Sequence, residues 1–134
     1  MKDICNRKDL ELLMKLFYQR LLNDNSINYL FTEVAKIDLH THLPHIVNFW
    51  EQSLFNSAVY KNNVMQIHLD LNIKEKLTPH FESWLKHFNN IVDEHFEGLN
   101  ADKIKTRALS IATIMKIKMQ WISKKFELLV NITL

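Results

Sequence analysis

One histidine and two aromatic residues with polar atoms stand among apolar neighbours in this chain. His68 lies in residues 64–71, which read VMQIHLDL, while Tyr18 follows Phe17 and Trp84 lies in a later apolar segment. A buried phenol or indole brings one polar group that needs a partner. An imidazole in apolar surroundings is either a hydrogen-bonded core group or a ligand to something bound. These three positions are therefore the first candidates for chemistry.

A second group of titratable side chains is the histidine-rich segment His40-Thr41-His42 with His45. His42 and His45 would share one helix face at i, i+3 spacing. A zinc site would need a third and a fourth ligand at about 2.0–2.3 Å, and nothing in the sequence designates them. A solvated helix face is the better interpretation. The single glycine excludes a glycine-rich phosphate loop, and the single cysteine excludes a cysteine-based metal cluster.

The length of 134 residues fits one domain. With one glycine and two prolines, the chain lacks the turn residues that a β-sandwich or β-barrel needs, so we expect helices to position these residues. Apolar residues recur at helical period over residues 8–22, 40–55 and 81–96, and from 101 to about 125. A short helix is expected around His68. The predicted buried positions are Leu10, Leu13, Met14, Phe17, Leu21 and Leu22; Leu43, Ile46, Val47, Trp50 and Leu54; Phe81, Trp84, Leu85, Phe88, Ile91 and Val92; and Ile104, Ala108, Ile111, Ala112, Met115 and Met119.

Proline, glycine and capping residues predict where these helices begin and end. Pro44 is expected near the first turn of its helix, where its missing N–H does no harm, and Thr78-Pro79 is expected to start the next one. Gly98 is expected to end that helix in a left-handed cap, and Asn100 to cap the final helix. Residues 1–9 carry mixed charges and no apolar core segment.

The charge and hydropathy of the chain limit the classes of partner that it could bind. A net charge of +2 with acids and bases interspersed lacks the basic stripe of a nucleic-acid-binding protein. No stretch approaches 18 uncharged apolar residues, so we expect no membrane span. Residues 1–9 do not read as a secretory signal. With Cys5 unable to form an internal disulfide, we predict a cytoplasmic location.

The order and spacing of several short motifs resemble the truncated haemoglobins, and most closely their third group. The asparagine-phenylalanine-tryptophan and histidine-leucine-aspartate-leucine segments are characteristic of that group, and the chain lacks the double-glycine motifs of the other groups. The resemblance covers roughly residues 10–120. Its motifs are Phe17-Tyr18, Phe31, His42, Asn48-Phe49-Trp50, His68-Leu69-Asp70-Leu71 and Ser83-Trp84-Leu85-Lys86.

This resemblance implies an all-α, two-over-two helical sandwich around haem b (iron protoporphyrin IX). The whole chain would form one globin-like domain, with residues 121–134 an unassigned C-terminal helical extension. His68 matches the proximal iron ligand, and Tyr18 and Trp84 match the distal polar pair, the candidates for a catalytic role. His42 matches the distal histidine.

The remaining cofactor-binding positions surround these residues. Phe31 matches the phenylalanine that packs on the porphyrin, and Ile46 and Phe49 match pocket positions. Val64, four residues before His68, could accept the other ring N–H on its carbonyl. The candidates for the haem propionates are Lys61, His45 and Tyr60.

The function implied is tight binding of dioxygen and related diatomic ligands, because two donors aimed at one polar ligand slow its release. Detoxification of nitric oxide or peroxide would need a separate reductase, since no flavin or nicotinamide signature is present. Two alternatives stay open. One is a haem-based sensor or partner-binding module that uses the apolar tail, which could also form an oligomer. The other is a helical scaffold without cofactor, in which His68 is a core group.

Overall fold

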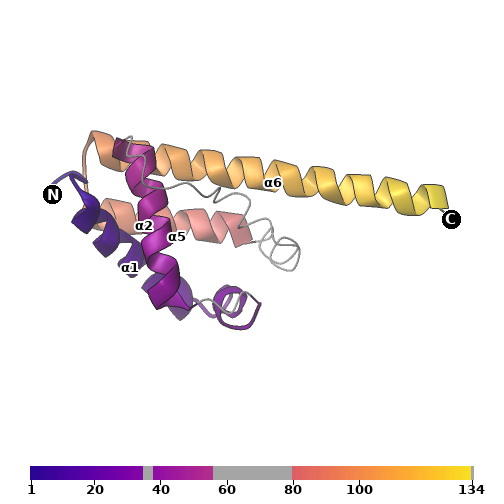
Figure 1. The fold of residues 1–134 in the computed structure, drawn as a ribbon, viewed down its shortest axis with the longest axis horizontal. Coiled ribbons are helices and arrows are strands. Elements are labelled where there is room, and N and C mark those ends of the chain that lie inside the picture. Colours follow the sequence, from indigo (N-terminus) through magenta and orange to yellow (C-terminus); the bar gives the residue numbers. More distant parts are fainter. Residues whose placement is uncertain (35–37, 56–79, 134) are drawn as a thin grey trace.

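The computed structural model describes residues 1–34, 38–55 and 80–133, with side chains up to residue 117 apart from those of residues 33 and 34. The helices are α1 (Arg7–Asn23), the short π-helix η1 (Leu30–Val34), α2 (Leu39–Phe55), α5 (Phe81–His95) and α6 (Leu99–Thr133). No strand occurs in these ranges, and the predicted all-α class is confirmed (Figure 1). None of the described helices is both long enough and apolar enough to cross a membrane.

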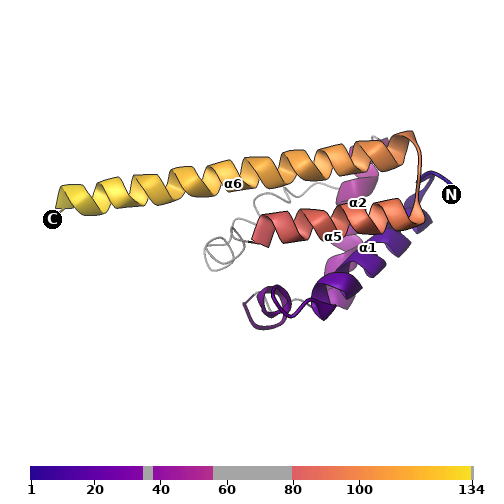
Figure 2. The same cartoon turned by 180° about the vertical axis from the view of Figure 1, so that it is seen from behind.

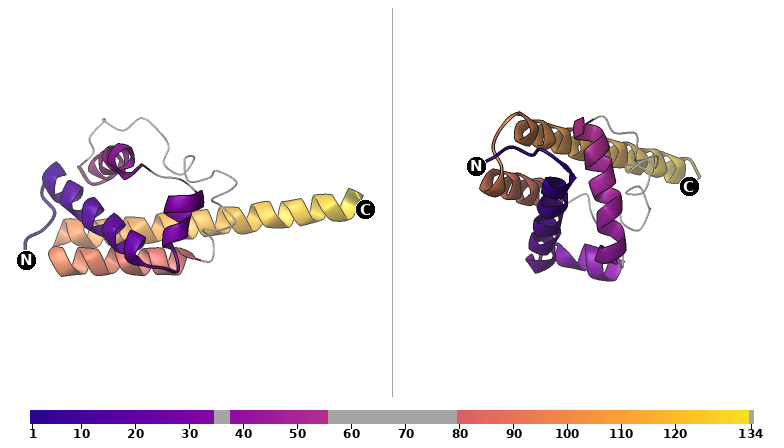
Figure 3. Two further views of the ribbon diagram at one scale, coloured as in Figure 1. Left: turned by 90° about the horizontal axis from the view of Figure 1, so that it is seen from below. Right: turned by 60° about the vertical axis from the view of Figure 1, so that its left-hand side comes forward.

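The helices pack as two pairs, α1 with α2 and α5 with α6. Helix α1 also packs along α5, and the end of α2 reaches the first turns of α6 (Figures 2 and 3). This is the two-over-two arrangement predicted from the sequence. The C-terminal half of α6 runs on beyond the other helices in every view. The predicted extension at residues 121–133 is therefore helical and continuous with α6.

The apolar stripes meet in one core between the two pairs of helices. Most of the predicted positions are buried, and Leu43, Trp84, Leu85 and Ile111 are partly buried against that core. The side chain of Met119 lies outside the described residues. The buried core positions are Ile4, Leu10, Leu13, Met14, Phe17, Tyr18, Leu21, Ile27, Leu30, Ile46, Val47, Trp50, Leu54, Phe81, Phe88, Ile91, Val92, Phe96, Ala101, Ile104, Ala108, Ala112 and Met115.

The N-terminal segment belongs to this core, contrary to the sequence expectation. Ile4 is 0% exposed, and the backbone N–H of Glu97 donates to the carbonyl of Lys2 at 3.0 Å. The carboxylate of Asp3 accepts from the backbone N–H groups of Asn100 and Ala101, both at 2.9 Å. These N–H groups at the start of a helix have no partner inside it. Asp3, rather than Asn100, therefore caps α6, while the Asn100 amide donates to the carbonyl of Ile4 at 2.7 Å.

Gly98 also differs from its predicted role. Helix α5 ends at His95, and its C-cap residue is Phe96, which is extended, so Gly98 does not cap α5. Its φ of 141° is a conformation that favours glycine, and its carbonyl accepts from the N–H of Asp102 at 3.0 Å to begin α6. A Cβ added there would lie 2.5 Å from Cγ of Asp3. The glycine permits the close approach of the residue that caps α6.

Helix α2 begins just after Asp38, whose carboxylate accepts from the N–H of His40 at 3.2 Å and the hydroxyl of Thr41 at 2.9 Å. Pro44 is consequently the sixth residue of α2, near the first turn as predicted, but beyond the positions at which a missing N–H does no harm. There it removes one helical hydrogen bond to the carbonyl of His40. Both residues are exposed, so solvent can hydrate that carbonyl. The predicted helix around His68 and the predicted start at Thr78-Pro79 lie outside the described residues.

Candidate functional site

Tyr18 is the polar centre of the described site. Its side chain comes from the buried face of α1 and is only 5% exposed. Its hydroxyl oxygen lies 3.0 Å from Nε2 of His42 on α2, and the two rings meet edge to face. Burial raises the pKa of the Tyr18 phenol well above its usual value, because it penalises the charged form. The phenol therefore stays protonated and can donate a hydrogen bond at any physiological pH.

A cluster of aromatic rings fixes Trp84 close to Tyr18. Phe17 contacts Tyr18, Trp84 and Phe88 edge to face, with ring centroids 5.1–5.6 Å apart. Trp84 also stacks on Phe88, at 5.7 Å and 17°. Phe31, on η1, meets the ring of Tyr18 at 6.0 Å. Such packing restricts the rotamers of the two side chains that the sequence nominated as the distal polar pair.

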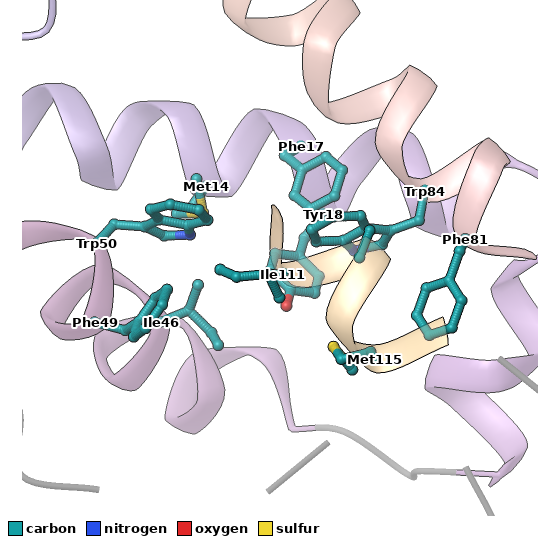
Figure 4. A pocket seen from close by; sticks show the side chains of 11 residues that line it. Met14, Phe17, Tyr18, Ile46, Phe49, Trp50, Phe81, Trp84, Ile111 and Met115 are labelled. Atoms are coloured by element: carbon teal, nitrogen blue, oxygen red, sulfur yellow. The ribbon is translucent and has the colours of Figure 1, made fainter. Parts of the chain in front are cut away.

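Between the helices lies a largely apolar pocket whose empty space, with its open mouth, is about 560 Å³. That figure includes space open to solvent, and the part that the centre of a water molecule can reach is about 50 Å³. Figure 4 shows Tyr18 and Trp84 on one side of the pocket and Ile46, Phe49 and Trp50 on the other. The complete lining is Met14, Phe17, Tyr18, Ile46, Phe49, Trp50, Phe81, Trp84, Ile111, Ala112 and Met115.

The structure brings together six of the predicted site residues. Tyr18, Trp84, Ile46 and Phe49 line the pocket, and His42 and Phe31 contact Tyr18. The other nominated positions, His68, Val64, Lys61 and Tyr60, lie outside the described residues. His45 is exposed on α2.

Several lining residues were predicted only as core. These are Met14, Phe17, Trp50, Phe81, Ile111, Ala112 and Met115. Helical period assigns each of them to a buried face, and a buried face looks the same in sequence whether it meets another side chain or a hollow. Only the resemblance, through His42, Ile46 and Phe49, marked α2 as a pocket wall.

The histidines of α2 do not assemble a metal site of their own. Among residues whose placement is described, no three His, Cys, Asp or Glu side chains come close enough to hold a metal ion. His42 instead lies against Tyr18. Over the described ranges the zinc interpretation therefore finds no support.

The chemistry of the pocket suits an apolar ligand or cofactor beside a few hydrogen-bond donors. Its walls are almost entirely hydrocarbon and aromatic ring, and the lining side chains that can donate a hydrogen bond are Tyr18, Trp84 and Trp50. Apolar walls bury an apolar group, and a few donors orient what binds beside it. The described residues thus have the chemistry that a haem pocket needs.

Comparison with known proteins agrees with this geometry. The crystal structure of a group III truncated hemoglobin from Campylobacter jejuni superposes with a TM-score of 0.75. The match covers 89% of this chain and 95% of that one, at 25% sequence identity. The chain has the truncated-globin fold. No family model matches the sequence, and no curated protein matches it either.

The resemblance to the third group of truncated haemoglobins, predicted from short motifs, is confirmed by that structure. The order of the short motifs supported this prediction, although the overall sequence identity is only 25%. Tyr18 on α1 and Trp84 on α5 come from opposite pairs of the two-over-two sandwich, so the fold itself brings them to one pocket.

Proposed function

We propose that this truncated globin binds haem in the pocket beside Tyr18 and Trp84, and that it holds dioxygen and other diatomic ligands tightly. The observation that carries the proposal is a protonated, buried phenol placed with an indole in an otherwise apolar pocket. Bound haem would supply an iron that binds diatomic ligands. His68 is the residue proposed to hold that iron.

The chain's own contribution begins with the exclusion of water. Ile46, Phe49 and Met115 give the pocket hydrocarbon walls, and a hydrogen bond made inside such walls is stronger than one made in water. Trp84 can only donate through its indole N–H. Tyr18 can donate through its hydroxyl proton, which burial keeps in place.

The contact between Tyr18 and His42 determines where that hydroxyl proton points. If Nε2 of His42 lacks a proton, it accepts from Tyr18, and the proton is turned away from a ligand. If Nε2 carries the proton, it donates to the Tyr18 oxygen and leaves the hydroxyl free to donate elsewhere. His42 thus acts on a ligand through the orientation of Tyr18.

The expected affinity follows from these donors. A hydrogen bond to a group that carries charge contributes about 1.5–3 kcal/mol, which corresponds to roughly ten- to hundredfold in affinity. Most of that gain appears as slower release. Tight holding favours ligand capture over bulk oxygen delivery. Conversion of nitric oxide or peroxide would require an external reductase as electron donor.

Oxygen dissociation from the haem-loaded protein tests this proposal. Tyr18→Phe and Trp84→Phe keep most of the side-chain volume and remove one donor each. We expect each to speed oxygen dissociation by roughly ten- to hundredfold, measured by rapid mixing with carbon monoxide. Tyr29→Phe is the matched control, because it removes a hydroxyl from a residue that does not line the pocket, and it should leave the rate unchanged. Unchanged rates in both test variants would refute the distal role.

A further inference from the structure

Arg7, the first residue of α1, holds α2 against α1. Its Nη1 donates to Oδ1 of Asn48 at 2.6 Å and lies 3.5 Å from a carboxylate oxygen of Glu51. Asn48 and Glu51 are three residues apart on α2, so they share one face of that helix. Within α1, Nε of Arg7 also donates to Glu11 at 3.2 Å. These acceptors on two helices restrict a side chain that otherwise has many rotamers.

Two cations from α6 hold the same half of α2. The ammonium of Lys103 donates to the carbonyl of Leu54 at 3.2 Å. The guanidinium of Arg107 donates to the carbonyl of Ser53 and, at 2.5 Å, to its hydroxyl. The last four carbonyls of a helix have no partner within it, and they carry the negative end of the helix dipole. The C-terminal half of α2 is therefore bound to α1 and to α6 at once.

One wall of the pocket lies between these attachments. Phe49 and Trp50 line the pocket from α2 (Figure 4), whereas Arg7, Lys103 and Arg107 are not among the lining residues. The three cations therefore act on the pocket through the placement of α2. The centre of a water molecule can reach only about 50 Å³ of the pocket, so even a small shift of this wall would change the space inside appreciably.

We infer that Arg7, Lys103 and Arg107 are positioning residues for the pocket wall of α2, and that they thereby limit the size of the ligand that the pocket admits. A ligand with a longer chain would have to displace Phe49 and Trp50. Because α2 is attached on two sides, that displacement requires the loss of hydrogen bonds from charged donors, which are stronger than those between neutral groups. The limit on ligand size rests on the proposed function, whereas the placement of α2 can be measured without haem.

Amide hydrogen exchange of the full-length, haem-free protein tests the placement of α2, because it reports local opening of a helix. Arg7→Met and Asn48→Leu remove the same bond from its two ends and keep most of the side-chain volume, and Lys103→Met with Arg107→Met removes the bonds from α6. We expect the amides of residues 46–52 to exchange about tenfold faster in each variant, as for one lost hydrogen bond to a charged donor. Adding Asn48→Leu to Arg7→Met should have no further effect.

The matched control is Arg20→Met, the same exchange near the other end of α1. The side chain of Arg20 is as exposed as that of Arg7, 34% against 36%. It donates to both carboxylate oxygens of Glu94 on α5, at 2.9 and 2.6 Å. These bonds do not involve α2, so the amides of residues 46–52 should exchange at the wild-type rate. An equal rise in Arg20→Met would mean that the contacts act through overall stability, and it would overturn the inference.

Alkyl isocyanides test the limit on ligand size in the haem-loaded protein. Methyl and n-butyl isocyanide bind iron through the same group and differ only in the length of the alkyl chain. We expect the ratio of n-butyl to methyl affinity to rise about tenfold in the Arg7, Asn48 and Lys103–Arg107 variants, since a single methylene can cost that much in a tight pocket. Arg20→Met should keep the wild-type ratio.

The two measurements separate the inference from the function on which it rests. Unchanged exchange in the test variants, or an unchanged isocyanide ratio, overturns the inference. A wild-type protein that takes up no haem refutes the proposed function, and the exchange rates then decide the placement of α2 by themselves.

Discussion

At the scale of single residues, Tyr18 shows what periodicity can and cannot predict. It lies one position beside the apolar stripe of α1, so the sequence placed its ring at the edge of the core, where the structure has it. Its partnership with His42 was not predictable. That contact depends on α2 beginning at Leu39, which the carboxylate of Asp38 sets. The role of His68 remains a prediction, because the residue lies outside the described ranges.

A second residue-scale feature is the pair formed by Asp24 and His87, which ties the end of α1 to α5. Oδ2 of Asp24 lies 2.6 Å from Nε2 of His87, and Oδ1 accepts from the N–H and hydroxyl of Ser26 at 2.9 and 2.6 Å. The bonds from Ser26 and His87 lower the pKa of Asp24 from 3.8 to about 2. The ionised carboxylate is therefore favoured in the folded state.

This pair predicts a pH-dependent loss of stability in Asp24→Asn. A lowered folded-state pKa adds stability that is fully present above the unfolded pKa and is lost as pH falls through the folded one. We expect a deficit of about 1 kcal/mol at neutral pH, which narrows below about pH 4. Urea unfolding from pH 7 to pH 3 measures it, with the exposed Asp93→Asn as control. A deficit that stays constant over this range would contradict the assignment.

At the scale of elements, the helices follow from the sequence better than their ends do. The apolar period gave α1, α2, α5 and the start of α6 to within two residues, because each helix buries one continuous stripe. The ends at Gly98 and Asn100 were assigned wrongly, since the cap of α6 comes from Asp3, 97 residues away in sequence. A local pattern contains no information about a partner at that separation.

The capped start of α6 supports a prediction about two neighbouring substitutions. Asp3→Ala should lower the unfolding free energy by about 1–2 kcal/mol, as for other lost helix caps. Burial opposes ionisation of Asp3, but the N–H groups of Asn100, Ala101 and Ile4 outweigh it and lower its pKa, so the cap is charged. Gly98→Ala should destabilise further, through its φ of 141° and its contact with Asp3.

The two effects should not add. Asp3→Ala removes two of the three atoms that a Cβ at residue 98 would meet, so Gly98→Ala should cost less in that background than in the wild type. Urea unfolding of the two single variants and the double variant completes the cycle. Strict additivity would mean that Gly98 is required for its φ alone.

At the scale of the whole molecule, the two-over-two sandwich brings residues that are far apart in the sequence together around one pocket. Helical period predicted an all-α chain but no arrangement of its helices. Motif order added the arrangement, and the Campylobacter jejuni structure agrees with it. The extension at residues 121–133 is helical, and its proposed use as a partner or oligomer surface stays a prediction.

The proposal also depends on a segment that lies outside the described residues. Tyr18 and Trp84 offer donors to a ligand of the iron, and a globin also needs an imidazole that holds the iron itself. That imidazole must come from residues 56–79 if the motif containing His68 acts as it does in the family it resembles. Binding of haem through His68 is thus the central claim.

Titration of the haem-free protein with haem, followed by its absorption spectrum, tests this claim most directly. The wild type should take up one equivalent and develop a Soret band. His68→Ala should lose most of that affinity, while His95→Ala, the same exchange at an exposed histidine of α5, should match the wild type. A wild type without a Soret band, or a His68→Ala variant that binds haem as tightly as the wild type, would contradict the account.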